Sequence, residues 1–112
     1  MSPAMLALLV ALSAGEKHGY ALAEEVELLT GGRLRLGPGT LYRTLQRMRV
    51  EELIRDAGPD VTATRADRRA ERRRRYAITP QGRRAARQEL AYLRDLLTCA
   101  PAARLLDESD ER

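Results

Sequence analysis

Apolar residues recur with helical spacing in four stretches of the chain. In residues 38–51, Leu41, Leu45 and Met48 occupy positions i, i+4 and i+7, which lie on one face of a helix. The polar residues between them fall on the opposite face, as in an amphipathic helix that packs on a core. Similar patterns predict three further helices, at residues 3–13, 19–29 and 80–99.

Capping signals support two of these helix starts. Ser2-Pro3 and Thr79-Pro80 each pair a helix-capping residue with a proline. Proline suits the first helical position because the N–H that it lacks has no partner there. Pro101 is expected to end the last helix, since proline disrupts a helix interior.

Two short stretches of strand character predict a β-hairpin. Residues 53–55 form its first strand and residues 74–78 its return strand, with a polar, arginine-rich loop at residues 57–73. Residues 34–36 also alternate and are compatible with a very short strand. Residues 16–19 are expected to form a turn.

The order of these elements predicts a winged helix-turn-helix. In that fold the third helix enters the major groove of DNA, and the hairpin, or wing, touches the flanking backbone or the minor groove. We therefore expect a mainly α fold with a small β-hairpin and one long C-terminal helix. The expected parts are a DNA-binding domain at residues 1–78, a dimerisation helix at residues 79–100 and a disordered acidic tail at residues 101–112.

Two helices carry more apolar surface than a chain of 112 residues is expected to cover. The first is apolar nearly all round, and the last has a leucine-rich stripe typical of helices that pair with another chain. The absence of Trp and Phe also limits the core. We therefore predict a C2 homodimer. Its expected interface residues are Met5, Leu6, Leu9, Ala86, Leu90, Leu93 and Leu97.

Basic charge is concentrated in the expected wing. The chain has a formal net charge of +4 and a pI near 9.8. Residues 65–75 hold seven arginines against two acidic residues, which favours a polyanionic partner such as DNA. Two alternatives stay open, because charge runs are often solvated loops and because Arg74 and Arg75 can serve the hairpin strand.

The polar face of residues 38–51 is suited to reading DNA. Arginine bonds guanine bidentately, and threonine offers a hydroxyl and a methyl group to base edges. The alternative is an ordinary amphipathic surface helix, which the same spacing also produces. The layout of the whole chain favours DNA binding. The residues predicted to contact DNA are Gly39, Thr40, Tyr42, Arg43, Thr44, Arg47, Arg68, Arg69, Arg72, Arg73, Arg74 and Arg75.

Other classes of function find little support. Cys99 and His18 are the only cysteine and histidine, so no intrachain disulfide forms, and neither a metal site nor a catalytic triad can be assembled. We therefore expect no cofactor and no enzyme activity. The apolar run at residues 5–12 is too short to span a membrane, and the chain is expected in the cytoplasm.

Several motifs together resemble the PadR family of bacterial transcriptional regulators. They are His18-Gly19-Tyr20, Gly37-Pro38-Gly39-Thr40-Leu41-Tyr42, Leu53-Ile54 and the run from Arg74 to Gly82, and the single long C-terminal helix resembles the short-tailed subgroup. The resemblance implies a homodimeric winged-helix repressor that binds a palindromic operator. It also implies that a small molecule releases the DNA in some members, and Tyr20 and Tyr92 are the candidate aromatic residues for that ligand.

The chain departs from the family pattern at two positions. Arg43 stands where the family usually has proline, and Glu52 where it usually has glycine. If the third helix ends in a left-handed residue, Glu52 costs about 1 kcal/mol relative to glycine. The competing class of function is a winged-helix adaptor that binds protein and lacks sequence-specific DNA binding.

Overall fold

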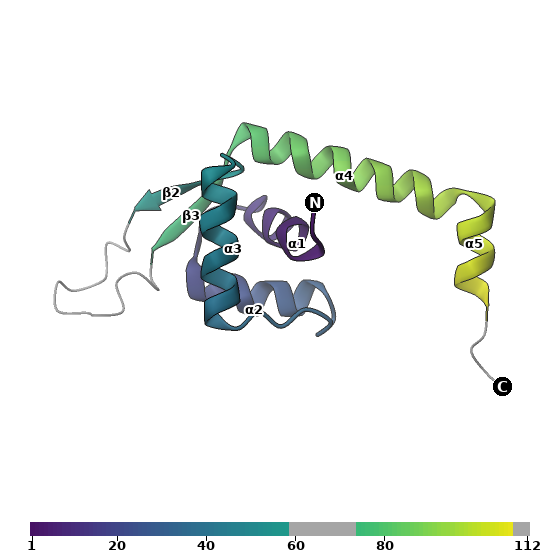
Figure 1. Ribbon diagram of the computed structural model, residues 1–112, viewed down its shortest axis with the longest axis horizontal. Helices are drawn as coiled ribbons and strands as arrows, with labels where there is room; N and C mark the ends of the chain where they lie inside the picture. Colours follow the sequence, from purple (N-terminus) through teal and green to yellow (C-terminus); the bar gives the residue numbers. More distant parts are fainter. Residues whose placement is uncertain (59–73, 109–112) are drawn as a thin grey trace.

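The computed structural model describes residues 1–58 and 74–108 of the chain (Figure 1). Helices α1, α2 and α3 gather beside a small sheet, whereas α4 leaves this body and α5 turns at its far end. The elements are α1 (Pro3–Leu12), β1 (Lys17–His18), α2 (Gly19–Leu29), α3 (Pro38–Val50), β2 (Ile54–Gly58), β3 (Arg75–Ile78), α4 (Pro80–Thr98) and α5 (Ala100–Asp107).

The core lies where the first three helices meet the sheet. Helix α1 is at its centre, because α2, α3, α4 and β3 all contact it. The predicted apolar face of α3 is confirmed, since Leu41, Leu45 and Met48 are all buried. The largest fully buried side chains are Leu8, Leu9, Leu12, Leu22, Val26, Leu45, Met48 and Ile54.

Three residues predicted at the dimer interface belong to this core. Leu9 has no exposed surface, and Met5 and Ala86 are each only 7% exposed within a single chain. Leu9 has no surface to offer a second subunit, so the prediction was wrong at that position, whereas for Met5 and Ala86 it stays a prediction. The apolar character of α1 on nearly all sides reflects its central place in one chain.

Three short antiparallel strands form a sheet in the order β1-β3-β2. Ile54 pairs with Ile78, as expected for the hairpin. Lys17 pairs with Tyr76, so the turn predicted at residues 16–19 was wrong and β1 takes its place. The alternating stretch at residues 34–36 forms no strand, since its two leucines pack against the helical core instead.

The C-terminal part contains a second helix that the sequence did not predict. Helix α4 ends at Thr98, and the extended backbone of Cys99 separates it from α5. Pro101 lies in the first turn of α5, where its missing N–H costs nothing. The disordered tail predicted from residue 101 was therefore wrong as far as Asp107, while residues 109–112 lie outside the described part of the chain.

Helix α3 ends at a left-handed residue. Glu52 has φ 62° and is the one non-glycine residue with positive φ in the described ranges. The N–H of Glu52 donates to the carbonyl of Arg49 (3.0 Å), and the N–H of Leu53 donates to the carbonyl of Met48 (2.9 Å). These two bonds form a Schellman motif, in which glycine is usual at the Glu52 position.

Helix α4 starts directly against this end of α3. The side-chain amide of Gln81 donates to the carbonyl of Glu51 at 3.2 Å, and the N–H of Thr79 donates to the carbonyl of Leu53 at 3.1 Å. A Cβ on Gly82 would collide with the same Leu53 carbonyl, so only glycine permits this approach. Together these contacts fix the direction in which α4 leaves the body.

Candidate nucleic-acid interface

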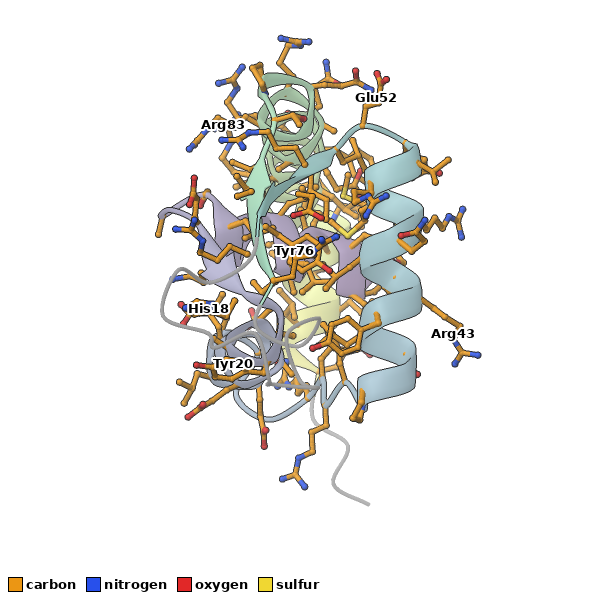
Figure 2. The ribbon with its side chains drawn as sticks, turned by 90° about the vertical axis from the view of Figure 1, so that its left-hand side faces the viewer. His18, Tyr20, Arg43, Glu52, Tyr76 and Arg83 are labelled. Atoms are coloured by element: carbon orange, nitrogen blue, oxygen red, sulfur yellow. The ribbon has the colours of Figure 1, made fainter. Side chains whose placement is uncertain are left out.

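The outward face of α3 is basic and open to solvent. Figure 2 shows Arg43 pointing away from the body of the molecule, and within residues 1–58 and 74–108 it makes no ion pair. Arg47 Nε lies 3.5 Å from Glu51 Oε1, an exposed i,i+4 pair of little strength. Both guanidinium groups can therefore turn to a DNA partner at small cost.

Small residues flank these arginines. The hydroxyl of Thr44 donates to the backbone carbonyl of Thr40 at 2.7 Å, so its proton is used inside the helix. Its lone pairs and methyl group stay available to a base edge. A Cβ on Gly39 would meet nothing within 4 Å, so this end of α3 is open to close approach by a partner.

Sequence reasoning missed two residues of the outward face. Gln46 and Val50 follow Arg43 by three and seven residues, and Val50 is 72% exposed. Glutamine bonds adenine bidentately, and apolar side chains contact the thymine methyl group. The spacing of both residues was visible in the sequence. They were missed because only arginine and threonine were considered on this face, and Gln46 is an amide and Val50 an aliphatic side chain.

Tyr42 holds the start of α3 against α2. A Cβ added to Gly19 would lie 3.0 Å from Cε1 and 3.1 Å from the hydroxyl oxygen of Tyr42, so the ring covers the backbone there. The N–H of Gly19 donates to the carbonyl of Arg74 at 3.0 Å. Helix α3 therefore meets the start of α2 and the base of the wing at this point.

The described part of the wing is its base, where both arginines form ion pairs. Arg74 Nη1 lies 2.7 Å from Asp56 Oδ2, and Arg75 Nη1 lies 3.4 Å from Glu16 Oε2. The pair of Arg74 links the two strands of the hairpin, and the pair of Arg75 links β3 to the segment before β1, as the structural alternative expected. The Arg74 side chain is 43% exposed, so this role leaves room for a DNA contact as well. The other predicted wing residues, Arg68, Arg69, Arg72 and Arg73, lie outside the described residues.

Helices α4 and α5 expose an apolar face beyond the winged body. Leu90 and Leu97 are 44% and 55% exposed, and Leu105 and Leu106 on α5 are more exposed still. Exposed apolar surfaces of this kind commonly mark interaction sites. The outer half of α4 lies away from the core in Figure 1, so the body of the chain does not cover this face.

The two candidate ligand residues lie in different places. Tyr20 stacks on His18 with ring centroids 5.5 Å apart, and it lines a cavity of about 150 Å³ that Tyr42 also lines. Tyr92 is exposed on α4 and does not line this cavity. A single chain therefore does not bring Tyr20 and Tyr92 together.

Other kinds of site find no support in the described residues. No helix among them is long and apolar enough to cross a bilayer. Their His, Cys, Asp and Glu side chains form no group of three or more that could hold a metal ion. Cys99 is half-buried at the corner between α4 and α5.

This arrangement of helices, hairpin and basic outward face defines a winged helix-turn-helix protein. The fold is similar to that of a PadR-like regulator from Bacillus cereus, with a TM-score of 0.67 and 22% identity over 94% of this chain and 92% of that one. It is also similar to Bacillus subtilis PadR, solved with operator DNA, with a TM-score of 0.66 and 20% identity over 80% of this chain and 48% of that one.

The sequence itself shows the family. Residues 8–88 match the model of the transcriptional regulator PadR-like family, and the chain belongs to that family. The members of that family are transcriptional regulators, and the chain belongs to this class of protein. A 37.1 kDa uncharacterised protein of transposon TN4556 from Streptomyces fradiae is 35% identical over 80 residues, or 71% of this chain, but the match spans only 20% of that longer protein.

Proposed function

We propose that the protein binds duplex DNA as a homodimer and represses transcription from a palindromic operator in the bacterial cytoplasm. The exposed basic face of α3 is the observation that carries this proposal. In winged helix-turn-helix proteins this helix enters the major groove. The similar PadR of Bacillus subtilis is known in complex with its operator, which supports the same use of the fold here.

The exposed apolar face of α4 and α5 supports the dimer. Leu90, Leu97, Leu105 and Leu106 are covered when a second copy packs on them. A two-fold dimer places two recognition helices about one DNA turn, roughly 34 Å, apart, which matches a palindromic site. Release of the operator by a small molecule stays a prediction, with the cavity beside Tyr20 as its candidate place.

Mapping the protected DNA upstream of the protein's own gene tests the proposal. Fluorescence anisotropy then compares the protected sequence with a scrambled duplex of equal composition over a range of salt concentrations. We expect the protected sequence to bind about a thousandfold tighter or more. On both duplexes log affinity is expected to fall linearly with log salt concentration. Equal affinity for both duplexes, or no salt dependence, would instead favour the protein-binding adaptor.

A further inference from the structure

A polar hollow of about 230 Å³ lies between α3 and the base of the wing, lined by side chains from both elements. Tyr42, Gln46 and Arg49 reach it from α3, where their i, i+4, i+7 spacing forms a stripe that borders the outward face and shares Gln46 with it. Arg74 and Tyr76, two residues apart, reach it from the wing side, and Figure 2 shows Tyr76 between the hairpin and α3. All five side chains can donate hydrogen bonds.

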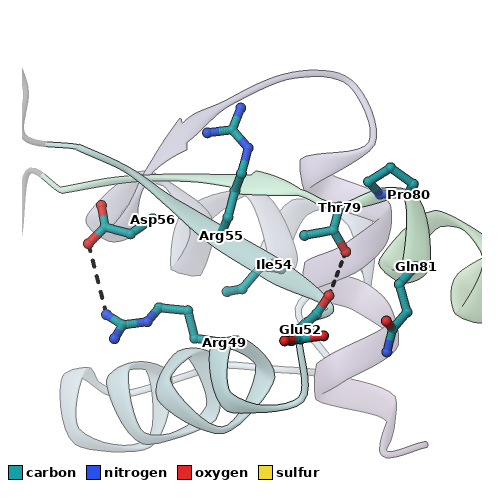
Figure 3. Close-up of a pocket in the computed structure, with 8 residues that line it drawn as sticks. All are labelled: Arg49, Glu52, Ile54, Arg55, Asp56, Thr79, Pro80 and Gln81. Carbon is teal, nitrogen blue, oxygen red and sulfur yellow. Dashed lines mark hydrogen bonds and ion pairs between the residues drawn. The ribbon is translucent and has the colours of Figure 1, made fainter.

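The hollow carries an excess of positive charge. Arg49 Nη1 and Arg74 Nη1 lie 3.9 Å and 2.7 Å from the same carboxylate oxygen of Asp56, and Figure 3 shows Arg49 reaching from α3 toward it. The other oxygen of Asp56 accepts the N–H of Gly58 at 2.8 Å. One carboxylate therefore faces two guanidinium groups. Each guanidinium has five N–H donors, so most of them are left for another acceptor.

The hydroxyl of Tyr76 remains a donor at neutral pH. Burial raises the pKa of Tyr76 above its usual value, and the nearby Asp56 carboxylate raises it further. The side chains of Arg49 and Arg74 are 39% and 43% exposed, so a ligand can reach both. A group with one negative charge and several acceptor oxygens satisfies this set, and a phosphodiester has that chemistry.

We propose that this hollow seats one backbone phosphate of bound duplex DNA, held between Arg49 of α3 and Arg74 at the base of the wing. The inference rests on the proposed function and deepens it, because it names a phosphate contact that fixes the recognition helix in the groove. Asp56 positions the two guanidinium groups before DNA arrives. The seat lies between the two elements that touch DNA in this fold, so the flanking backbone passes over it.

Neutralising single phosphates of the mapped operator tests the seat. Each flanking phosphate is replaced in turn by an uncharged methylphosphonate, and affinity is measured for the unmodified protein and for Arg49→Gln. We expect one position per half-site at which the unmodified protein loses about tenfold in affinity. At that position Arg49→Gln is expected to lose nothing further, since its partner group is already absent. Arg74→Gln is expected to behave in the same way.

Arg55→Gln is the matched control, because Arg55 lies on the same hairpin, outside the hollow, and pairs with Glu16 at 3.7 Å. It is expected to keep the full response to every methylphosphonate. The proposed phosphate seat is wrong if, at every position, the affinity loss from the methylphosphonate simply adds to the loss from Arg49→Gln or Arg74→Gln. Circular dichroism must then show that both variants are folded, and both must still bind the operator. This result would leave the proposed function intact. Thermal stabilisation of the DNA-free protein by inorganic phosphate that Arg49→Gln abolishes, together with no methylphosphonate position at which the unmodified protein loses affinity, would overturn the seat in favour of a small-anion site.

Discussion

The hydroxyl of Thr79 donates a hydrogen bond of 2.6 Å to the backbone carbonyl of Glu52 (Figure 3). The oxygen of the same hydroxyl accepts the N–H of Gly82 at 2.9 Å. One side chain therefore caps the start of α4 and also binds the residue that ends α3. Helices α3 and α4 are therefore joined at this threonine.

Replacing Thr79 with valine is expected to lower stability. Valine keeps the shape but removes both hydrogen bonds, and loss of an N-cap alone costs about 1 kcal/mol. The melting temperature is expected to fall by about 4–8 °C, measured by circular dichroism at equal protein concentration. Thr79→Ser retains the hydroxyl and serves as the control. If serine and valine lower the melting temperature equally, the hydroxyl bonds do not stabilise the joint.

A methyl group on Gly82 is expected to disrupt the same joint. Its Cβ would overlap the carbonyl of Leu53, which belongs to the backbone and cannot rotate away. Gly82→Ala is therefore expected to lose stability, although alanine is the better helix former by about 1 kcal/mol. Gly39→Ala is the control, since a Cβ there meets nothing and α3 is expected to gain stability. A gain of stability in Gly82→Ala would contradict the close packing of the two helices.

Replacing Glu52 with glycine is expected to raise stability. Glu52 adopts φ 62°, which strains any residue with a Cβ, and glycine relieves about 1 kcal/mol. Urea unfolding measures the difference, with the slope expected to stay unchanged. Glu52→Ala removes the carboxylate but keeps the strain, so it separates the backbone effect from charge. Equal stability of the glycine and alanine variants would show that the strain is absent.

Arg43→Ala is expected to reduce operator affinity more than affinity for random DNA. If Arg43 bonds a base bidentately, its loss costs about 1–3 kcal/mol on the operator. Fluorescence anisotropy on both duplexes measures the two effects. Arg84 is an exposed arginine of α4. Arg84→Ala therefore removes the same charge away from α3 and serves as the control. Equal losses on the two duplexes would assign Arg43 to phosphate contact instead of base contact.

Leu97→Asp is expected to separate folding from association. Leu97 is 55% exposed in a single chain, so aspartate there leaves the fold intact but would bury an unpaired carboxylate in a dimer. Sedimentation is expected to show a folded monomer with weak operator binding. Gln88→Asp, on an exposed position of the same helix, controls for added charge. An unmodified protein that sediments as a monomer while binding its operator tightly would contradict the dimer.

Local signals in the sequence predicted the helices well. Ser2-Pro3 and Thr79-Pro80 determine helix starts through their own capping bonds, and both threonine and serine make those bonds in the structure. Strand β1 was missed because two residues carry no periodicity, and only their pairing with Tyr76 and Arg75 of β3 makes them a strand. Pro101 was misread because proline suits the first turn of a helix as well as the end of another.

The candidate site was predicted less completely, for a different reason. Periodicity marks Leu9 and Leu97 alike as apolar, but only the fold shows that the first is buried and the second exposed. The ion pair of Arg74 with Asp56 joins distant parts of the chain across a hairpin, so residue type alone could not assign Arg74. Gln46 was missed because residues were selected by chemical type, whereas its position on the helix places it on the outward face.

The joint between α3 and α4 has a consequence for how such regulators diverge. The bonds of Thr79 and Gln81 to the end of α3 use backbone carbonyls, so they place no demand on the side chains that face DNA. In the proposed dimer, substitutions on the outward face of α3 are therefore expected to change base preference while the distance between the two copies of α3 stays constant. Substitutions along α4 are expected to change that distance without changing base preference. We expect the operator sequence and the half-site spacing to change independently of each other as such regulators diverge.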